Sequence, residues 1–102
     1  MKGPKTYDEY MDLVHQAVYE VDEMRAGIEY DPENAERWST MLDHLDGVLR
    51  KLYQDMVDNV YEFPTGRDLQ YMQFVNRWGR EIPFKQLLAV INETHKNGLS
   101  RG

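Results

Sequence analysis

Cysteine is absent from this chain of 102 residues. Its absence excludes disulfide bonds, thiol catalysis and metal sites with cysteine ligands. Long apolar runs are missing too. The longest aliphatic stretch spans only residues 87–91, whereas a membrane helix needs about 20 apolar residues. The first ten residues also lack the apolar core of a signal peptide. We therefore expect a cytoplasmic protein with no membrane partner.

Sequence motifs that name a reaction are also missing. The two serines, Ser39 and Ser100, do not stand beside a histidine and an acid at a spacing typical of nucleophilic catalysis. The seven glycines form neither a Walker nor a dinucleotide-binding pattern. A di-iron bundle needs two Glu-x-x-His motifs, and the only comparable pair here is Asp12 with His15. No stretch matches a family motif, so we expect no enzymatic activity, catalytic residue, cofactor or metal.

The three histidines have different surroundings in the sequence. His15 and His44 are expected at solvated or boundary positions of their helices. His95 follows Ile91 by four residues and should lie on a buried face near the end of the last helix. The helix dipole there favours a protonated imidazole, whereas burial opposes it. A structural histidine is the favoured interpretation, and a pH-sensing role stays open.

Basic residues are scarce in the first part of the chain. Residues 1–63 hold 15 acidic and 6 basic residues, a net charge of −9, whereas residues 64–102 hold 3 acidic and 6 basic residues, a net charge of +3. The total of −6 argues against nucleic acid as a partner. Either the acids form an ordinary solvated surface, or the basic part docks on the acidic part, within one chain or in a partner.

Two long amphipathic helices are predicted over residues 7–28 and 32–63. The first begins at a capping box of Thr6 and Glu9, and the second at Asp31 with Pro32 in its first position. Each has one apolar seam with alternating spacings of three and four. The seams are Tyr7, Tyr10, Val14, Ala17, Val21, Met24 and Ile28, and then Ala35, Trp38, Leu42, Leu45, Leu49, Leu52, Met56 and Phe63.

The short turn between these helices makes them antiparallel neighbours. The second helix should extend beyond the first by about two turns. Its overhang would carry Met56, Val60 and Phe63, which need a cover from the C-terminal residues or from a second chain.

Two shorter helices are predicted over residues 66–78 and 83–97. The first has apolar residues on a broad arc of its surface, which favours contacts on two sides. The second should end at Asn97 and Gly98, a glycine cap. The fold class is therefore all-α: one four-helix, bundle-like domain over residues 1–102, with a long antiparallel helical hairpin and two shorter C-terminal helices.

Composition and pattern favour a non-enzymatic protein–protein interaction or regulatory module. The partner is another protein or a second copy of the chain, as in a homodimer. Gly47 supports this interpretation, because glycine inside a helix costs about 0.5–1 kcal/mol relative to alanine and close approach of another helix would explain it. The expected interaction surface comprises Gly47, Met56, Val60, Phe63, Phe74 and Trp78.

Two alternatives remain open. The first is a helical bundle that binds a small ligand or metal in its core, with a pocket lined by Trp38, Tyr53, Tyr71 and Trp78. The second is an acidic mimic of nucleic acid. A helix-turn-helix formed by the last two helices is disfavoured, because the molecule is acidic and the turn contains Pro83.

Overall fold

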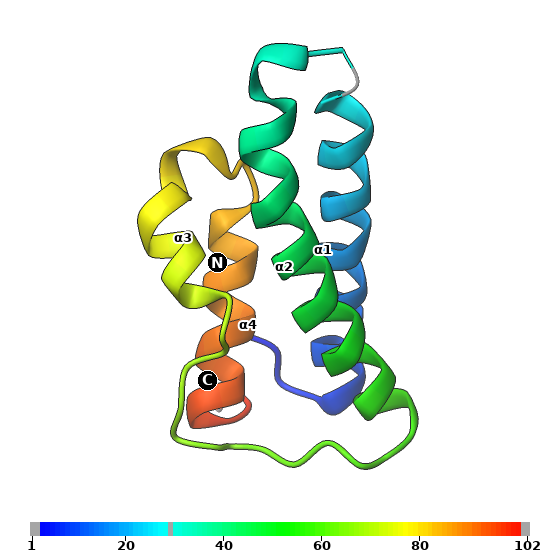
Figure 1. Ribbon diagram of the computed structural model, residues 1–102. Helices are drawn as coiled ribbons and strands as arrows, with labels where there is room; N and C mark the ends of the chain where they lie inside the picture. Colours follow the sequence, from blue (N-terminus) through cyan, green and yellow to red (C-terminus); the bar gives the residue numbers. More distant parts are fainter. Residues whose placement is uncertain (1–2, 29, 101–102) are drawn as a thin grey trace.

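The computed structural model describes residues 3–28 and 30–100, and for residue 34 the backbone alone. All regular structure in these residues is helical, which confirms the all-α prediction. A long antiparallel hairpin stands beside a shorter helical pair (Figure 1). The elements are α1 (Tyr7–Ile28), α2 (Pro32–Val57), α3 (Met72–Trp78), the 3₁₀ turn η1 (Gly79–Glu81) and α4 (Lys85–Asn97).

The apolar seams predicted for α1 and α2 face one another along the hairpin. Burial of one such side chain stabilises a fold by about 1.5–3 kcal/mol. Leu88 and Ile91 of α4 join the same core and are also fully buried. The fully buried side chains of the hairpin include Tyr10, Val14, Ala17, Val21, Leu42, Leu45 and Leu49.

The start of α1 is the capping box expected from the sequence. The amide of Glu9 donates to the hydroxyl of Thr6 at 3.1 Å, and the Glu9 carboxylate accepts from the amide of Thr6 at 3.3 Å. The same carboxylate accepts from the amide of Lys5 at 2.7 Å. These bonds satisfy amides that have no partner inside the helix. The helix spans Tyr7–Ile28, so both of its predicted ends are confirmed.

The end of α2 differs from the prediction, because the helix stops at Val57 rather than at residue 63. Asn59 adopts a left-handed conformation with φ of 59°. The amide of Val60 donates to the carbonyl of Asp55 at 3.0 Å, and the amide of Asn59 donates to the carbonyl of Met56 at 3.3 Å. This pair of bonds is a Schellman motif, which satisfies the last carbonyls of the helix and turns the chain away from its axis.

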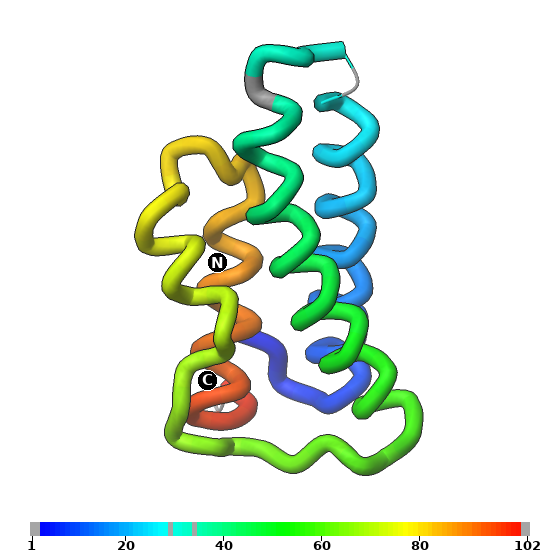
Figure 2. The backbone as a smooth tube through the Cα atoms, in the orientation of Figure 1, coloured from blue at the N-terminus to red at the C-terminus, as the bar shows by residue number. Residues whose placement is uncertain are grey.

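Residues 58–71, which we call the strap, connect α2 to α3 as an extended segment. The strap leaves the lower end of α2, crosses beneath the molecule and rises beside α4 (Figures 1 and 2). It covers the lower end of the hairpin, where we expected a cover from the C-terminal residues or from a second chain. Phe63, for example, lies against Tyr7 and Tyr10, with ring centroids 6.0 and 5.2 Å apart.

The start of α3 was also predicted wrongly, since the helix begins at Met72 instead of residue 66. The amide of Thr65 donates to the carbonyl of His95, and the amide of Gly66 donates to the carbonyl of Lys96, each at 2.9 Å. The strap backbone thus caps the last carbonyls of α4 instead of forming helical bonds of its own.

The last helix begins two residues later than predicted, at Lys85, and ends at Asn97 as expected. Gly98 follows with φ of 98°, and its amide donates to the carbonyl of Thr94 at 2.8 Å. The chain then passes the N-terminal segment, where the amide of Ser100 donates to the carbonyl of Pro4 at 2.7 Å.

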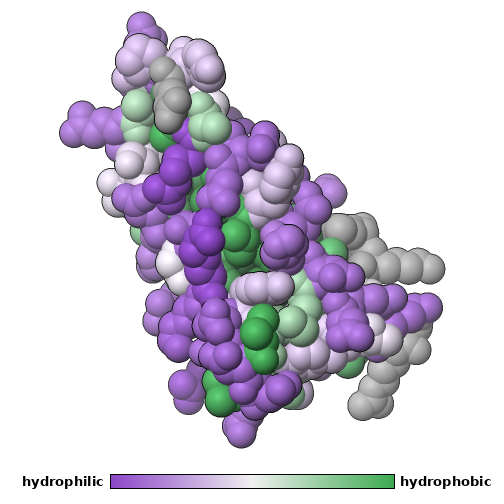
Figure 3. Space-filling view, turned by 90° about the vertical axis from the view of Figure 1, so that its right-hand side faces the viewer, coloured by the Kyte–Doolittle hydropathy of each residue, from purple (hydrophilic) through white to green (hydrophobic). Residues whose placement is uncertain are grey.

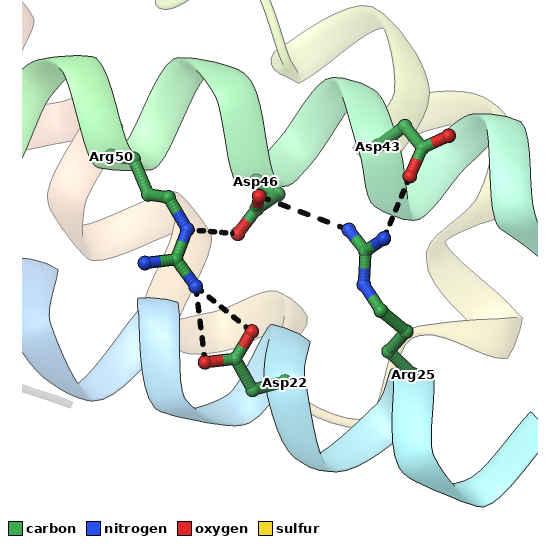
Figure 4. Close-up of polar contacts among 5 residues, drawn as sticks. All are labelled: Asp22, Arg25, Asp43, Asp46 and Arg50. Carbon is green, nitrogen blue, oxygen red and sulfur yellow. Dashed lines mark hydrogen bonds and ion pairs between the residues drawn. The ribbon is translucent and has the colours of Figure 1, made fainter.

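Ion pairs join the outer surfaces of α1 and α2 in an alternating ladder (Figure 4). Arg25 contacts Asp43 at 2.9 Å and Asp46 at 3.8 Å, and Arg50 contacts Asp46 at 2.7 Å and Asp22 at 3.0 Å. Pairs as exposed as these contribute about 0.2–1 kcal/mol each. The ladder favours the register of the hairpin, whereas the buried seam provides most of its stability.

The surface of the hairpin is mainly hydrophilic when viewed from the right-hand side of Figure 1 (Figure 3). Hydrophobic residues show in a narrow central stripe and at the lower end (Figure 3). Val57 and Val60, 47% and 66% exposed, belong to the region where α2 meets the strap. None of the helices described is long and apolar enough to cross a bilayer.

Candidate interaction surface

A groove of about 600 Å³ lies between α2 and the strap, and we call it the strap groove. Its apolar lining comes from Val48 and Leu52 of α2 and from Val60 and Leu69 of the strap. Helical spacing places Val48 and Leu52 one turn apart on the same face of α2. The groove is therefore a surface depression with an aliphatic lining, and Leu52 at its base belongs to the packed core.

Charged side chains of both signs line the same groove. Lys51 and Asp55 of α2 form an ion pair at 3.2 Å. The strap contributes Glu62, Arg67 and Asp68. A mixture of signs beside an apolar lining resembles the polar rim of a protein interface more than a site for one small charged ligand.

Asn92 of α4 fixes the strap beside the groove. Its side-chain oxygen accepts from the amide of Leu69 at 2.6 Å, and its side-chain nitrogen donates to Asp68 at 2.9 Å. The bond from Asn92, together with the charge of Lys96, lowers the pKa of Asp68. Only 6% of the Asn92 surface is exposed, so its amide group acts as a buried clip between two elements.

A chain of hydrogen bonds extends from the core to the groove through three aromatic residues. The hydroxyl of Tyr10 lies 3.4 Å from the carbonyl of Ile91 and 2.8 Å from the hydroxyl of Tyr61. The hydroxyl of Tyr61 lies 2.7 Å from Nδ1 of His95. Tyr61 and His95 both line the strap groove.

Each tyrosine hydroxyl has one proton, so the two short bonds run in one direction together. They run either from Tyr10 through Tyr61 to Nδ1 of His95, or from Nδ1 through Tyr61 to Tyr10. Only the second direction leaves the Tyr10 proton for the carbonyl of Ile91, at 3.4 Å the longest of the three distances. The direction therefore follows the tautomer of His95.

Burial sets the protonation of all three rings. Desolvation lowers the pKa of His95, which favours its neutral form. Desolvation also raises the pKa of Tyr61 to about 12. The pKa of Tyr10 is raised further, by burial first and then by its bond to Tyr61. At neutral pH the chain of bonds thus holds two neutral phenols and a neutral imidazole.

The backbone of the strap offers further hydrogen-bonding groups beside the groove. The carbonyls of residues 60–63 accept no hydrogen bond from the described part of the chain, and the amides of Glu62 and Phe63 donate none. Extended backbone with free donors and acceptors can pair with an added strand.

The six residues of the predicted interaction surface do not form one surface. Val60 lines the strap groove. Met56 is 1% exposed and belongs to the core, so its place on that surface was wrong. Gly47 is exposed, and a Cβ added at this position would meet no atom within 4 Å, so no other described helix approaches it closely. Phe63 packs between tyrosines beneath the hairpin.

The other two predicted residues, Phe74 and Trp78, are half-buried on α3. Phe74 stacks on His44 with ring centroids 4.3 Å apart. Nε2 of His44 is buried and has no hydrogen-bond partner in the described chain. Trp78 lies beneath the guanidinium group of Arg37, 4.7 Å from the ring centroid.

The aromatic pocket of the small-ligand alternative is not assembled. Tyr71 is fully buried, and its hydroxyl donates to the carbonyl of Leu88 at 2.6 Å. Tyr53 and Trp78 line two separate depressions. Among the described residues, no group of three acidic or histidine side chains could hold a metal ion.

Sequence reasoning missed the strap residues of the groove because it assigned most of them to helices. The usable signal was Asn59, since asparagine follows glycine in its tolerance of the left-handed conformation that ends a helix. No local pattern indicated that the side chain of Asn92 bonds to the strap at Asp68 and Leu69, because these segments are far apart in the sequence.

In comparisons with protein-family models, curated proteins and solved structures, no match to this chain was found.

Proposed function

We propose that this chain is a non-enzymatic protein-interaction module and that its docking surface is the strap groove. The observation that carries the proposal is the groove itself: aliphatic side chains from two elements, charged residues of both signs, and the exposed Val60. Exposed apolar surface with a polar rim is typical of protein-binding sites.

The partner segment that suits this groove is extended and apolar. One wall of the groove is a strap whose backbone has free carbonyls at residues 60–63, so an extended segment gains backbone hydrogen bonds there. Its side chains would contact Val48, Leu52 and Leu69. The imidazole of His95 also lines the groove and adds a polar contact for the partner.

Site-specific photo-crosslinking tests the proposal in the full chain. A photoreactive phenylalanine at position 60 should capture one predominant protein in the cells that make this chain. The same group at position 19 is the matched control, because Tyr19 is 54% exposed on α1 and lies outside the groove. A product of twice the 12.1 kDa chain mass would identify a second copy as the partner.

Affinity for the captured partner then provides the quantitative test. Val60→Asp should weaken binding at least about tenfold, equivalent to about 1.4 kcal/mol, whereas Tyr19→Asp should leave it unchanged. Both side chains are exposed, so neither change should unfold the chain. The proposal would be refuted if positions 60 and 19 gave the same crosslinked products. It would also be refuted if Val60→Asp and Tyr19→Asp bound the partner with equal affinity.

A further inference from the structure

The chain turns back from α3 through η1 beside α2 (Figure 1). A depression of about 340 Å³ lies at this turn. Its lining residues are Arg37, Arg77, Trp78, Arg80 and Glu81, and we call it the Trp78 corner. We propose that the Trp78 corner binds a phosphate monoester. It shares no lining residue with the strap groove, so this inference stands or falls separately from the proposed function.

Two guanidinium groups are positioned by the indole ring. Cζ of Arg37 lies 4.7 Å from the ring centroid of Trp78, and Cζ of Arg77 lies 5.9 Å from it. Both distances fall within the range of a cation–π contact. A cation–π contact uses the charge of a guanidinium group and not its N–H bonds. The N–H groups of Arg77, and those of Arg37 that do not face Glu81, can therefore donate to an oxyanion.

The charge balance of the corner differs from that of the ladder in Figure 4. In the ladder three carboxylates serve two arginines. In the corner the single carboxylate of Glu81 pairs with Arg37 at 2.8 Å. Within the described residues, Arg77 and Arg80 have no ion pair. An acidic molecule thus holds an unneutralised basic site.

The fold creates this site by the way it joins the two halves of the chain. A basic C-terminal part docked on acidic helices would have paired its arginines with hairpin carboxylates. The ion pair between the halves that the structure describes has the opposite polarity, with Arg37 on α2 and Glu81 on η1. The arginines of α3 and η1 therefore remain available to a ligand.

The charge and size of the corner indicate the ligand class. Its four charged lining residues sum to +2. A phosphate monoester carries about −1.5 to −2 at pH 7 and offers three acceptor oxygens, so it balances this charge, whereas one carboxylate balances half of it. A volume of about 340 Å³ is at the lower end of the roughly 300–1,000 Å³ of small-ligand sites.

Nuclear magnetic resonance of the two indole groups tests the inference. A phosphoserine peptide and glycerol phosphate should both shift the indole N–H signal of Trp78. The indole nitrogen of Trp38 is buried, so its signal serves as the internal control and should move less. Tighter binding of the peptide would identify a phosphorylated protein as the source, and equal binding would identify the phosphate ester alone.

Substitutions distinguish the corner from general charge attraction. Arg77→Gln with Arg80→Gln should weaken binding of the phosphoserine peptide at least about tenfold. Arg67→Gln removes one positive charge from the strap groove and should change affinity less than about twofold. All three arginines are exposed, so these changes should not unfold the chain, and the full amide spectrum reports the fold directly.

Three outcomes would overturn the inference. The first is no Trp78 shift at about 10 mM phosphoserine peptide. The second is equal binding of the same peptide with glutamate in place of phosphoserine, which would indicate a carboxylate site. The third is an equal loss of affinity in the Arg67→Gln variant, which would indicate attraction by net charge without a defined site.

Discussion

His95 links the packed interior to the strap groove through single hydrogen bonds. Its Nδ1 lies 2.7 Å from the hydroxyl of Tyr61, and that hydroxyl lies 2.8 Å from the hydroxyl of Tyr10. Each hydroxyl has one proton, so both bonds take the direction that the imidazole tautomer sets. When the imidazole is protonated, Nδ1 can only donate, and the chain of bonds then runs from His95 through Tyr61 and Tyr10 to the carbonyl of Ile91.

The lowered pKa of His95 predicts how stability depends on pH. Below about pH 6.5 the unfolded chain takes up a proton at His95 that the folded chain resists. The unfolded state then binds more protons, so the free energy of unfolding falls as the pH decreases, until the folded pKa is reached. Above about pH 6.5 both states are neutral and His95 contributes no pH dependence.

Urea unfolding at a series of pH values checks this prediction. His95→Asn keeps a hydrogen-bonding group near the position of Nδ1 and removes the titrating group, so its stability should depend less on pH than that of the parent chain. His15→Asn is the control, because His15 is exposed. Parallel pH profiles for the parent chain and His95→Asn would contradict the prediction.

At the scale of elements, local signals predicted the structure where local bonds determine it. The capping box placed the start of α1 correctly, and the two apolar seams identified the hairpin. Errors arose where bonds between distant segments replace helical ones. The strap amides at Thr65 and Gly66 bond to the end of α4, so the predicted start of α3 was too early. Likewise, only Val60 of the predicted surface lines the strap groove.

The end of α2 depends on the left-handed conformation of Asn59. Asn59→Ala should reduce the free energy of unfolding by about 1 kcal/mol, because a Cβ without a polar group disfavours that conformation. Asn59→Gly should be neutral or slightly stabilising, since glycine tolerates positive φ. Chemical denaturation of both variants checks the pair. Equal losses in alanine and glycine variants would show that the asparagine side chain, and not the backbone angle, matters there.

At the scale of the whole molecule, apolar contacts hold the C-terminal half on the hairpin. α4 buries Leu88 and Ile91 completely against the hairpin core. Charge contributes little across this boundary, because the ion pair described there is the partly exposed pair of Arg37 and Glu81. The two halves should therefore unfold together as one cooperative unit.

Truncation of Leu88 tests this cooperativity. Leu88→Ala should cost about 2–5 kcal/mol, a large part of the about 5–15 kcal/mol that stabilises a typical domain. The transition should remain single when followed by helical signal and by tryptophan fluorescence. Trp38 reports on the hairpin and Trp78 on the C-terminal half. Val57→Ala, at a 47% exposed position, should change stability by less than about 0.5 kcal/mol. Two separate transitions in Leu88→Ala would show that the hairpin folds independently of α4.

The bond between the Ser100 amide and the Pro4 carbonyl has a topological consequence. Because these two positions touch, a short peptide could join the ends of the described chain without stretching it. New termini could then open at the turn near Tyr30, which is 89% exposed. Such a circularly permuted chain would keep all four α-helices in place, but α1 would emerge last during synthesis instead of first.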